Sequence, residues 1–191
     1  MDDVVIISKN LEELNLMIPD LQEKSKLAGL ELNHEKTKIL TKAPNPEMKI
    51  EGKKIEKVEE IIYSGQLISL ENSMEREIEI RIAATWKKFW SLKFIFKGKF
   101  KNHLKASIFN SCVIPVLTYG SQTWALSKKD EIKIRTTQNT TMRSILSMKR
   151  RDRIKIANIY SKLKNTNNVV HVVRRQKWDW EGRGTRVKNE G

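Results

Sequence analysis

Residues 2–7 read DDVVII, two adjacent carboxylates followed by four β-branched residues. An unbroken β-branched run is typical of a strand buried on both faces, so we expect a strand over residues 4–7. Neighbouring carboxylates at the end of such a strand are costly unless a cation lies against them, and Mg²⁺ is the usual cation. Asp2 and Asp3 are therefore candidate metal ligands. The alternative interpretation is a solvated acidic N-terminus.

Three further motifs follow the acidic doublet along the chain. Residues 29–38 read GLELNHEKTK, residues 63–68 read YSGQLI, and residues 115–126 read PVLTYGSQTWAL. In kind and order, the four stretches resemble the C-terminal palm and thumb of reverse transcriptases of LINE-type (non-LTR) retrotransposons. The resemblance covers about residues 1–150 and extends more weakly to about residue 180.

The resemblance implies an RNA-directed DNA polymerase, a nucleotidyltransferase that extends a DNA primer on an RNA template. Asp2 and Asp3 would then hold Mg²⁺, Lys36 would assist the departing pyrophosphate, and Tyr63, Ser64 and Gly65 would flank the primer end. Ser64 stands where the family usually has leucine. From the residues alone, Lys36 is a solvated turn residue and Tyr63 a core residue.

The same resemblance predicts a chain that is inactive alone. In the family, an earlier aspartate on a separate strand shares the metal ions with the turn carboxylates, and two-metal chemistry needs that third ligand. This chain starts at Met1, after the position where that aspartate and the fingers would lie. We therefore expect Asp2 and Asp3 to bind Mg²⁺ weakly or not at all, and the chain to be a fragment.

Charge is distributed unevenly along the chain. Residues 1–70 hold 10 Lys/Arg against 13 Asp/Glu, whereas residues 71–191 hold 27 against 10, within an overall net charge of +14. Such an excess in one half indicates a polyanionic partner, either an RNA–DNA hybrid or another nucleic acid. The alternatives are a solvated charged face and a non-catalytic nucleic-acid-binding module. The candidate phosphate contacts are Arg76, Arg81, Lys87, Lys88, Lys149, Arg150, Arg151, Arg153, Arg174, Arg175 and Lys177.

Periodicity predicts an α+β fold, with a small antiparallel sheet and one helix followed by helices alone. We expect a first helix after Asn10 that bends or breaks near Ile18, because Pro19 follows it. The other expected elements are strands at 30–32, 37–40 and 61–63, hairpin strands at 48–51 and 57–58, and helices at 73–96, 101–113 and 128–148. The expected domains are a partial palm at 1–70, a helical thumb-like bundle at 71–148, and a basic, partly disordered extension at 149–191.

Several classes are excluded by what the sequence lacks. Cys112 is the single cysteine, so an internal disulfide is impossible. The chain has no apolar run near 18 residues, which predicts neither a signal peptide nor a membrane span, and an intracellular protein of the nucleus or cytoplasm, not a secreted one. We expect no membrane partner; an acidic membrane surface is the alternative for the basic half, disfavoured because its helices show no single polar face. His34, His103 and His171 are scattered, so zinc is unsupported.

Overall fold

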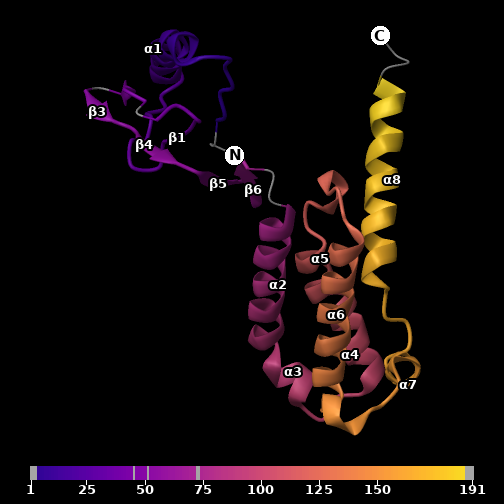
Figure 1. The fold of residues 1–191 in the computed structure, drawn as a ribbon. Coiled ribbons are helices and arrows are strands. Elements are labelled where there is room, and N and C mark those ends of the chain that lie inside the picture. Colours follow the sequence, from indigo (N-terminus) through magenta and orange to yellow (C-terminus); the bar gives the residue numbers. More distant parts are fainter. Residues whose placement is uncertain (1–3, 45, 51, 72–73, 188–191) are drawn as a thin grey trace. The chain divides into compact units, whose positions relative to one another are not determined.

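The computed structural model of the chain describes residues 4–44, 46–50, 52–71 and 74–187, with side chains up to residue 182. The chain divides into two compact units, Met1–Asn72 and Ser73–Gly191 (Figure 1). The first unit contains short strands and one long helix, and the second contains helices, so the predicted α+β class is confirmed. The finer division into residues 71–148 and 149–191 stays a prediction.

The described residues of the first unit form one helix and six short strands. Its buried centre consists of Ile18, Ile39, Met48, Ile50 and Ile55. Strand β1 pairs with β4 in parallel, whereas β2 with β3 and β5 with β6 form antiparallel pairs. The elements are α1 (Leu11–Leu27), β1 (Lys38–Leu40), β2 (Lys49–Ile50), β3 (Lys53–Lys54), β4 (Glu56–Val58), β5 (Glu60–Tyr63) and β6 (Gln66–Ser69).

Two of the predicted strands are wrong. Residues 4–7 and residues 30–32 lie outside strands, and the side chain of Ile7 is 86% exposed. A β-branched run favours a strand only where another strand pairs with it, and no described strand pairs with residues 4–7. The expected hairpin between residues 48–51 and 57–58 is also wrong. Residues 57–58 pair in parallel with β1, whereas β2 turns at Gly52 and pairs with β3.

Helix α1 begins as predicted. The side chain of Asn10 accepts a hydrogen bond from the Glu13 N–H at 2.8 Å. A break near the proline is wrong, since the helix continues past Pro19 to Leu27, with Ile18 buried beside the proline, whereas the alternative of a bend stays a prediction. Gly29 then adopts a left-handed φ of 74°, and the Leu30 N–H donates to the Ser25 carbonyl at 2.8 Å. This arrangement is a Schellman cap, which explains the glycine of the 29–38 motif.

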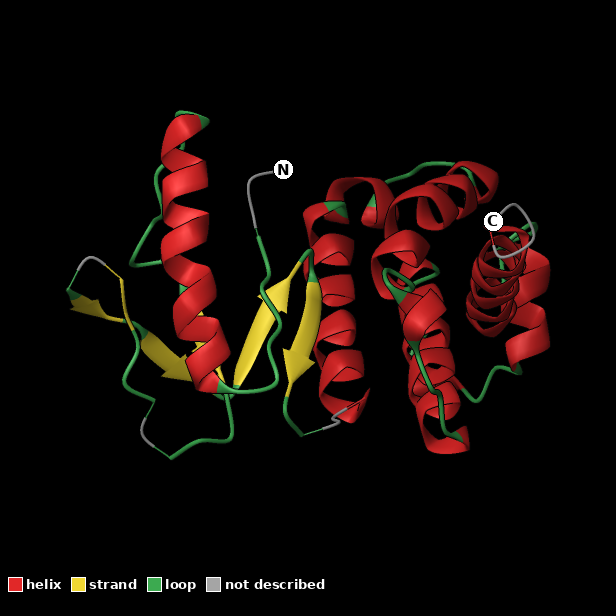
Figure 2. Cartoon of the chain, turned by 90° about the horizontal axis from the view of Figure 1, so that it is seen from above, coloured by secondary structure: helices red, strands yellow, loops and turns green. Residues whose placement is uncertain are grey.

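The second unit is a helical bundle around one apolar core. Helix α2 packs against α5 and α6, and α8 packs against α6 and η2 (Figures 1 and 2). Buried aromatic side chains of the core include Phe89, Phe96, Phe109 and Trp124. The elements are α2 (Met74–Ser91), α3 (Lys93–Lys97), α4 (Asn102–Ile108), η1 (Phe109–Val113), α5 (Ile114–Leu117), η2 (Ser121–Thr123), α6 (Lys128–Ile145), η3 (Arg150–Asp152), α7 (Ile156–Lys162) and α8 (Val169–Val187).

The predicted long helices exist, but local side chains change where they end. The helix expected over 73–96 divides at Leu92, where the Ser91 hydroxyl donates to the Lys88 carbonyl at 2.8 Å and competes with the helical ladder. The helix expected over 101–113 continues through Pro115, because the wide π-turn η1 before it leaves room for a ring that lacks an N–H. Helix α6 ends before Ser147, which has a φ of 56°.

Candidate nucleic-acid interface

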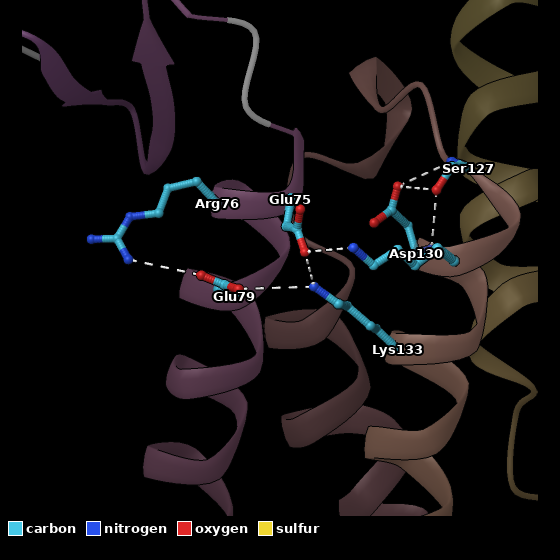
Figure 3. Close-up of polar contacts among 7 residues, drawn as sticks. Glu75, Arg76, Glu79, Ser127, Asp130 and Lys133 are labelled. Carbon is cyan, nitrogen blue, oxygen red and sulfur yellow. Dashed lines mark hydrogen bonds and ion pairs between the residues drawn. The ribbon is translucent and has the colours of Figure 1, made fainter.

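The N-terminal ends of α2 and α6 are joined by ion pairs (Figure 3). Glu75 accepts hydrogen bonds from Lys129 at 3.1 Å and Lys133 at 2.5 Å, and Lys133 also lies 3.8 Å from Glu79. The bonds from Lys133 and Lys129 hold the pKa of Glu75 below its usual value, and the bond to Glu75 raises the pKa of Lys133. At this end of the bundle, carboxylates therefore neutralise the lysines.

Two of the predicted phosphate contacts also lie at this end. Arg76 is 3.9 Å from Glu79, and Arg174 of α8 donates to Glu131, in the first turn of α6, at 2.9 Å. Arg175 and Lys177 are exposed on α8. The positive charge of α8 is thus partly paired with the acidic start of α6.

Arg81, another predicted phosphate contact, is not at the surface. Its side chain is 9% exposed and donates to Glu77 at 2.7 Å, one turn earlier on α2. The guanidinium also lies over the ring of Tyr119, 4.8 Å from its centroid. Because the guanidinium is buried and already paired with a carboxylate, it is not accessible to a phosphate. Arg81 is therefore not part of the interface that we propose.

The 115–126 motif, which carries Tyr119, forms a junction inside the bundle. Gly120 takes a left-handed φ of 74°, which only glycine adopts without strain. Ser121, next to it, is buried, and its hydroxyl donates to the Gln176 side chain on α8. Trp124 is also buried. The residues of this motif therefore connect α5 to α8.

At the opposite end of the bundle, α3 meets the C-terminal end of α6. The Lys97 ammonium donates to the Ser144 carbonyl, and Arg143 donates to the Ile154 carbonyl at 2.9 Å, just beyond η3. Partial desolvation, and then the charges of Lys105 and Lys93, lower the pKa of Lys97. The nearby charges of Lys105 and Lys93 are the sign of an excess of positive charge at this end.

The sequence explains this excess. Between Glu79 and Asp130 the chain carries ten lysines or arginines and no Asp or Glu. The basic run around η3 joins them at the same end of the bundle, with Asp152 Oδ2 accepting from the Lys149 N–H at 2.7 Å. We call the following exposed cations the cationic end: Lys93, Lys97, Lys99, Lys101, Lys149, Arg150, Arg151 and Arg153.

The two ends of the bundle differ in how many of their cations are paired with carboxylates. Among the described residues, carboxylates form ion pairs with cations at the N-terminal ends of α2 and α6, but with none of the eight side chains of the cationic end. Lys87 is exposed and Lys88 half-buried on α2. Prediction from the sequence included the η3 cations but missed Lys93, Lys97, Lys99 and Lys101, although the stretch from 80 to 129 visibly contains no Asp or Glu.

The residues predicted for catalysis and primer binding lie in the first unit. Asn33 builds the turn before β1, since its side chain accepts from the Lys36 N–H at 3.1 Å and its carbonyl from the Thr37 hydroxyl at 2.7 Å. The Lys36 side chain is exposed on this turn. Ser64 and Gly65 form the turn between β5 and β6, and Tyr63 before them is half-buried.

The metal ligands predicted from the sequence, Asp2 and Asp3, lie outside the described residues. Within the described part of the chain, no group of three or more His, Cys, Asp or Glu side chains is arranged to hold a metal ion. The assignment of Mg²⁺ to Asp2 and Asp3 therefore stays a prediction.

The chain is thus an α+β protein with a basic helical unit, and comparison adds one relative. It is 27% identical over 197 aligned residues to F52C9.6 of Caenorhabditis elegans, which is named as a transposon-derived protein; the alignment covers 98% of this chain and 71% of the relative. This similarity fits a retrotransposon origin. No family model matches the chain, and no solved structure matches it. No helix among the described residues is long and apolar enough to cross a membrane.

Proposed function

We propose that the chain is a C-terminal palm and thumb portion of a non-LTR reverse transcriptase, and that its helical unit binds nucleic acid. The order of the four motifs and the similarity to a transposon-derived protein support the lineage. The observation that carries the binding function is the cationic end, where positive side chains from α3, the α3–α4 loop and η3 gather without carboxylate partners among the described residues.

Binding at the cationic end is electrostatic in this proposal. Lysines and arginines that replace condensed counterions on phosphates gain free energy from counterion release, which does not depend on base sequence. Cations already paired with carboxylates gain less, because the pair must separate first. The cationic end is therefore a better phosphate-binding surface than the α2 and α6 N-terminal ends.

The polymerase roles belong to the first unit and stay part of the proposal. Asp2 and Asp3 would hold Mg²⁺, which would stabilise negative charge on the reacting phosphate. The Lys36 side chain is exposed on its turn, from which it would reach a pyrophosphate. The Ser64–Gly65 turn is also exposed and would lie against the primer end.

The test measures binding and catalysis with the same protein. The full chain is titrated into a labelled RNA–DNA hybrid at 50 and 200 mM salt, and primer extension with Mg²⁺ is assayed alongside. We expect binding that weakens steeply with salt, by about 10³ to 10⁵ if six to ten phosphates are contacted. Absence of binding at low salt would contradict the proposal.

A non-catalytic nucleic-acid-binding module is the second candidate, favoured by the confinement of the cationic end to the helical unit. The double variant Asp2→Ala/Asp3→Ala separates the two. Extension that the double variant abolishes supports a polymerase. Hybrid binding that the double variant leaves unchanged, together with no extension by the parent chain, supports the binding module.

A further inference from the structure

Two phenylalanines lie on the surface among the lysines of the cationic end. Phe94, on α3, is 81% exposed, and Phe100, before α4, is 39% exposed. Their rings meet edge to face, with centroids 5.8 Å apart and an interplanar angle of 70°. By contrast, Phe96 between them in sequence is fully buried in the core. The exposed pair is therefore separate from the core.

A glycine makes room for this pair. A Cβ at Gly98 would lie 2.5 Å from the Phe94 carbonyl oxygen and 3.0 Å from two carbons of the Phe100 ring. The φ of Gly98 is −71°, which any residue adopts, so the requirement is for space and not for backbone freedom. The loop between α3 and α4 thus holds Phe100 against Phe94 in a way that a larger residue would prevent.

We infer that the Phe94–Phe100 pair is a stacking surface for the bases of a single-stranded nucleic acid, with Lys93, Lys99 and Lys101 on its phosphates. This inference deepens the proposed function, on which it rests. Aromatic side chains within a positively charged groove or face are the usual means of holding single strands, since every base has a π-face. Inside a duplex those faces are covered by neighbouring base pairs, so the bases of a duplex are not available to stack on Phe94.

The surroundings of the pair favour nucleic acid over a protein partner. Lysine is depleted in protein–protein interfaces, whereas Lys93, Lys99 and Lys101 surround the pair in sequence and are all exposed. The acid-free stretch from 80 to 129 provides no carboxylate of its own to neutralise them. A polyanion with exposed apolar faces complements both the charge and the rings.

The test compares single strands with a duplex of the same length. Fluorescence anisotropy measures binding of the full chain to a labelled 12-nucleotide RNA, the corresponding DNA strand and a 12-base-pair duplex. A length of about 12 nucleotides lets each strand extend a few phosphates beyond the phenylalanine pair. The variants are Phe94→Ala, Phe94→Leu and Phe100→Ala. Ile132→Ala is the matched control, because it removes another exposed apolar side chain, from α6. Tryptophan fluorescence verifies that each variant is folded.

We expect Phe94→Ala to weaken single-strand binding about 5- to 150-fold, the range for loss of one stacked base, and to leave duplex binding within about twofold. Phe94→Leu should weaken it nearly as much, because leucine keeps the apolar surface but not the π-face. Ile132→Ala should bind as the parent does.

Four results would overturn the inference. Equal losses on single strands and duplex, or no loss on either, would mean that the rings do not stack on bases while the proposed nucleic-acid binding stands. A dimer that Phe94→Ala dissociates, with oligonucleotide binding unchanged, would assign the pair to self-association. If the parent chain binds neither single strands nor duplex at 50 mM salt, the inference and the proposed function both fail.

Discussion

Arg81 and Lys87 lie on the same helix but in different surroundings. Glu77, one turn before Arg81, accepts a hydrogen bond from the Arg81 guanidinium, and the pair is buried in the bundle. Lys87 has no carboxylate one turn before it and is exposed. Residue type alone predicted both as phosphate contacts. The spacing from Glu77 to Arg81 was visible in the sequence, but the burial of the pair under Tyr119 depends on tertiary packing that the sequence does not display.

The buried pair yields a stability prediction. Glu77→Ala leaves Arg81 buried without its carboxylate, and such a loss costs about 3–5 kcal/mol. Glu79→Ala, on the same helix, removes exposed ion pairs and should cost less than about 1 kcal/mol. Urea unfolding followed by tryptophan fluorescence reports the second unit specifically, because all five tryptophans lie after residue 73. Equal costs for the two variants would show that Arg81 is solvated.

The turn between β5 and β6 yields a second prediction. Ser64 has a φ of 49° and Gly65 a φ of 78°, the pattern of a type I′ hairpin turn, which favours Asn-Gly. We expect Ser64→Asn to slow amide hydrogen exchange in β5 and β6, and Gly65→Ala to speed it by about fivefold, since alanine costs about 1 kcal/mol at positive φ. Changes in the same direction in both variants would contradict this turn.

At the scale of elements, prediction succeeded where a signal was local and failed where it needed a partner. The Asn10 cap and the glycine turns at 29, 52 and 65 depend on neighbouring residues, and they are confirmed. Strand 4–7 depended on a pairing strand that the described residues do not supply. Strands β1 and β4 pair although the whole β2–β3 hairpin lies between them in the sequence, and no local pattern specifies such a parallel pair.

The contact between α2 and α6 predicts a response to pH. The pKa of Glu75 is lowered from 4.5 in the folded chain, so its contribution to stability is fully present above about pH 4.5 and disappears as pH falls through the lowered pKa. Lys133, with its pKa raised from 10.5, loses its contribution only as pH rises above that value. At pH 6 the parent should therefore be more stable than Glu75→Gln.

Thermal unfolding at pH 6 and pH 3 measures this difference. The Tm difference between the parent and Glu75→Gln should shrink as the pH falls through the lowered pKa of Glu75, because protonation removes its charge. The difference should also shrink in high salt, because the pair is exposed and salt screens it. A Tm difference that stays constant with pH would show that Glu75 does not join the two helices electrostatically.

For the whole molecule, the sequence predicted the α+β class and the change of charge sign near residue 70, and the boundary between the two units falls at residues 72–73. It did not predict which cations share an end of the bundle. That grouping depends on the contact of Lys97 with Ser144, 47 positions apart, which brings α3 beside the start of the η3 run. Side chains distant in sequence are assigned to one surface only once the bundle is known.

The most direct measurement of the central claim is the salt dependence of duplex binding by two matched triple variants. One replaces residues 149–151, at the cationic end, with glutamine, and the other replaces Arg174, Arg175 and Lys177 of α8. If the cationic end holds the phosphates, the first variant should reduce the slope of log K against log salt by about 2 to 3, at about 0.9 per lost contact, and the second by less than about 1. A larger reduction from the α8 variant, or the parent slope from both, would contradict the claim.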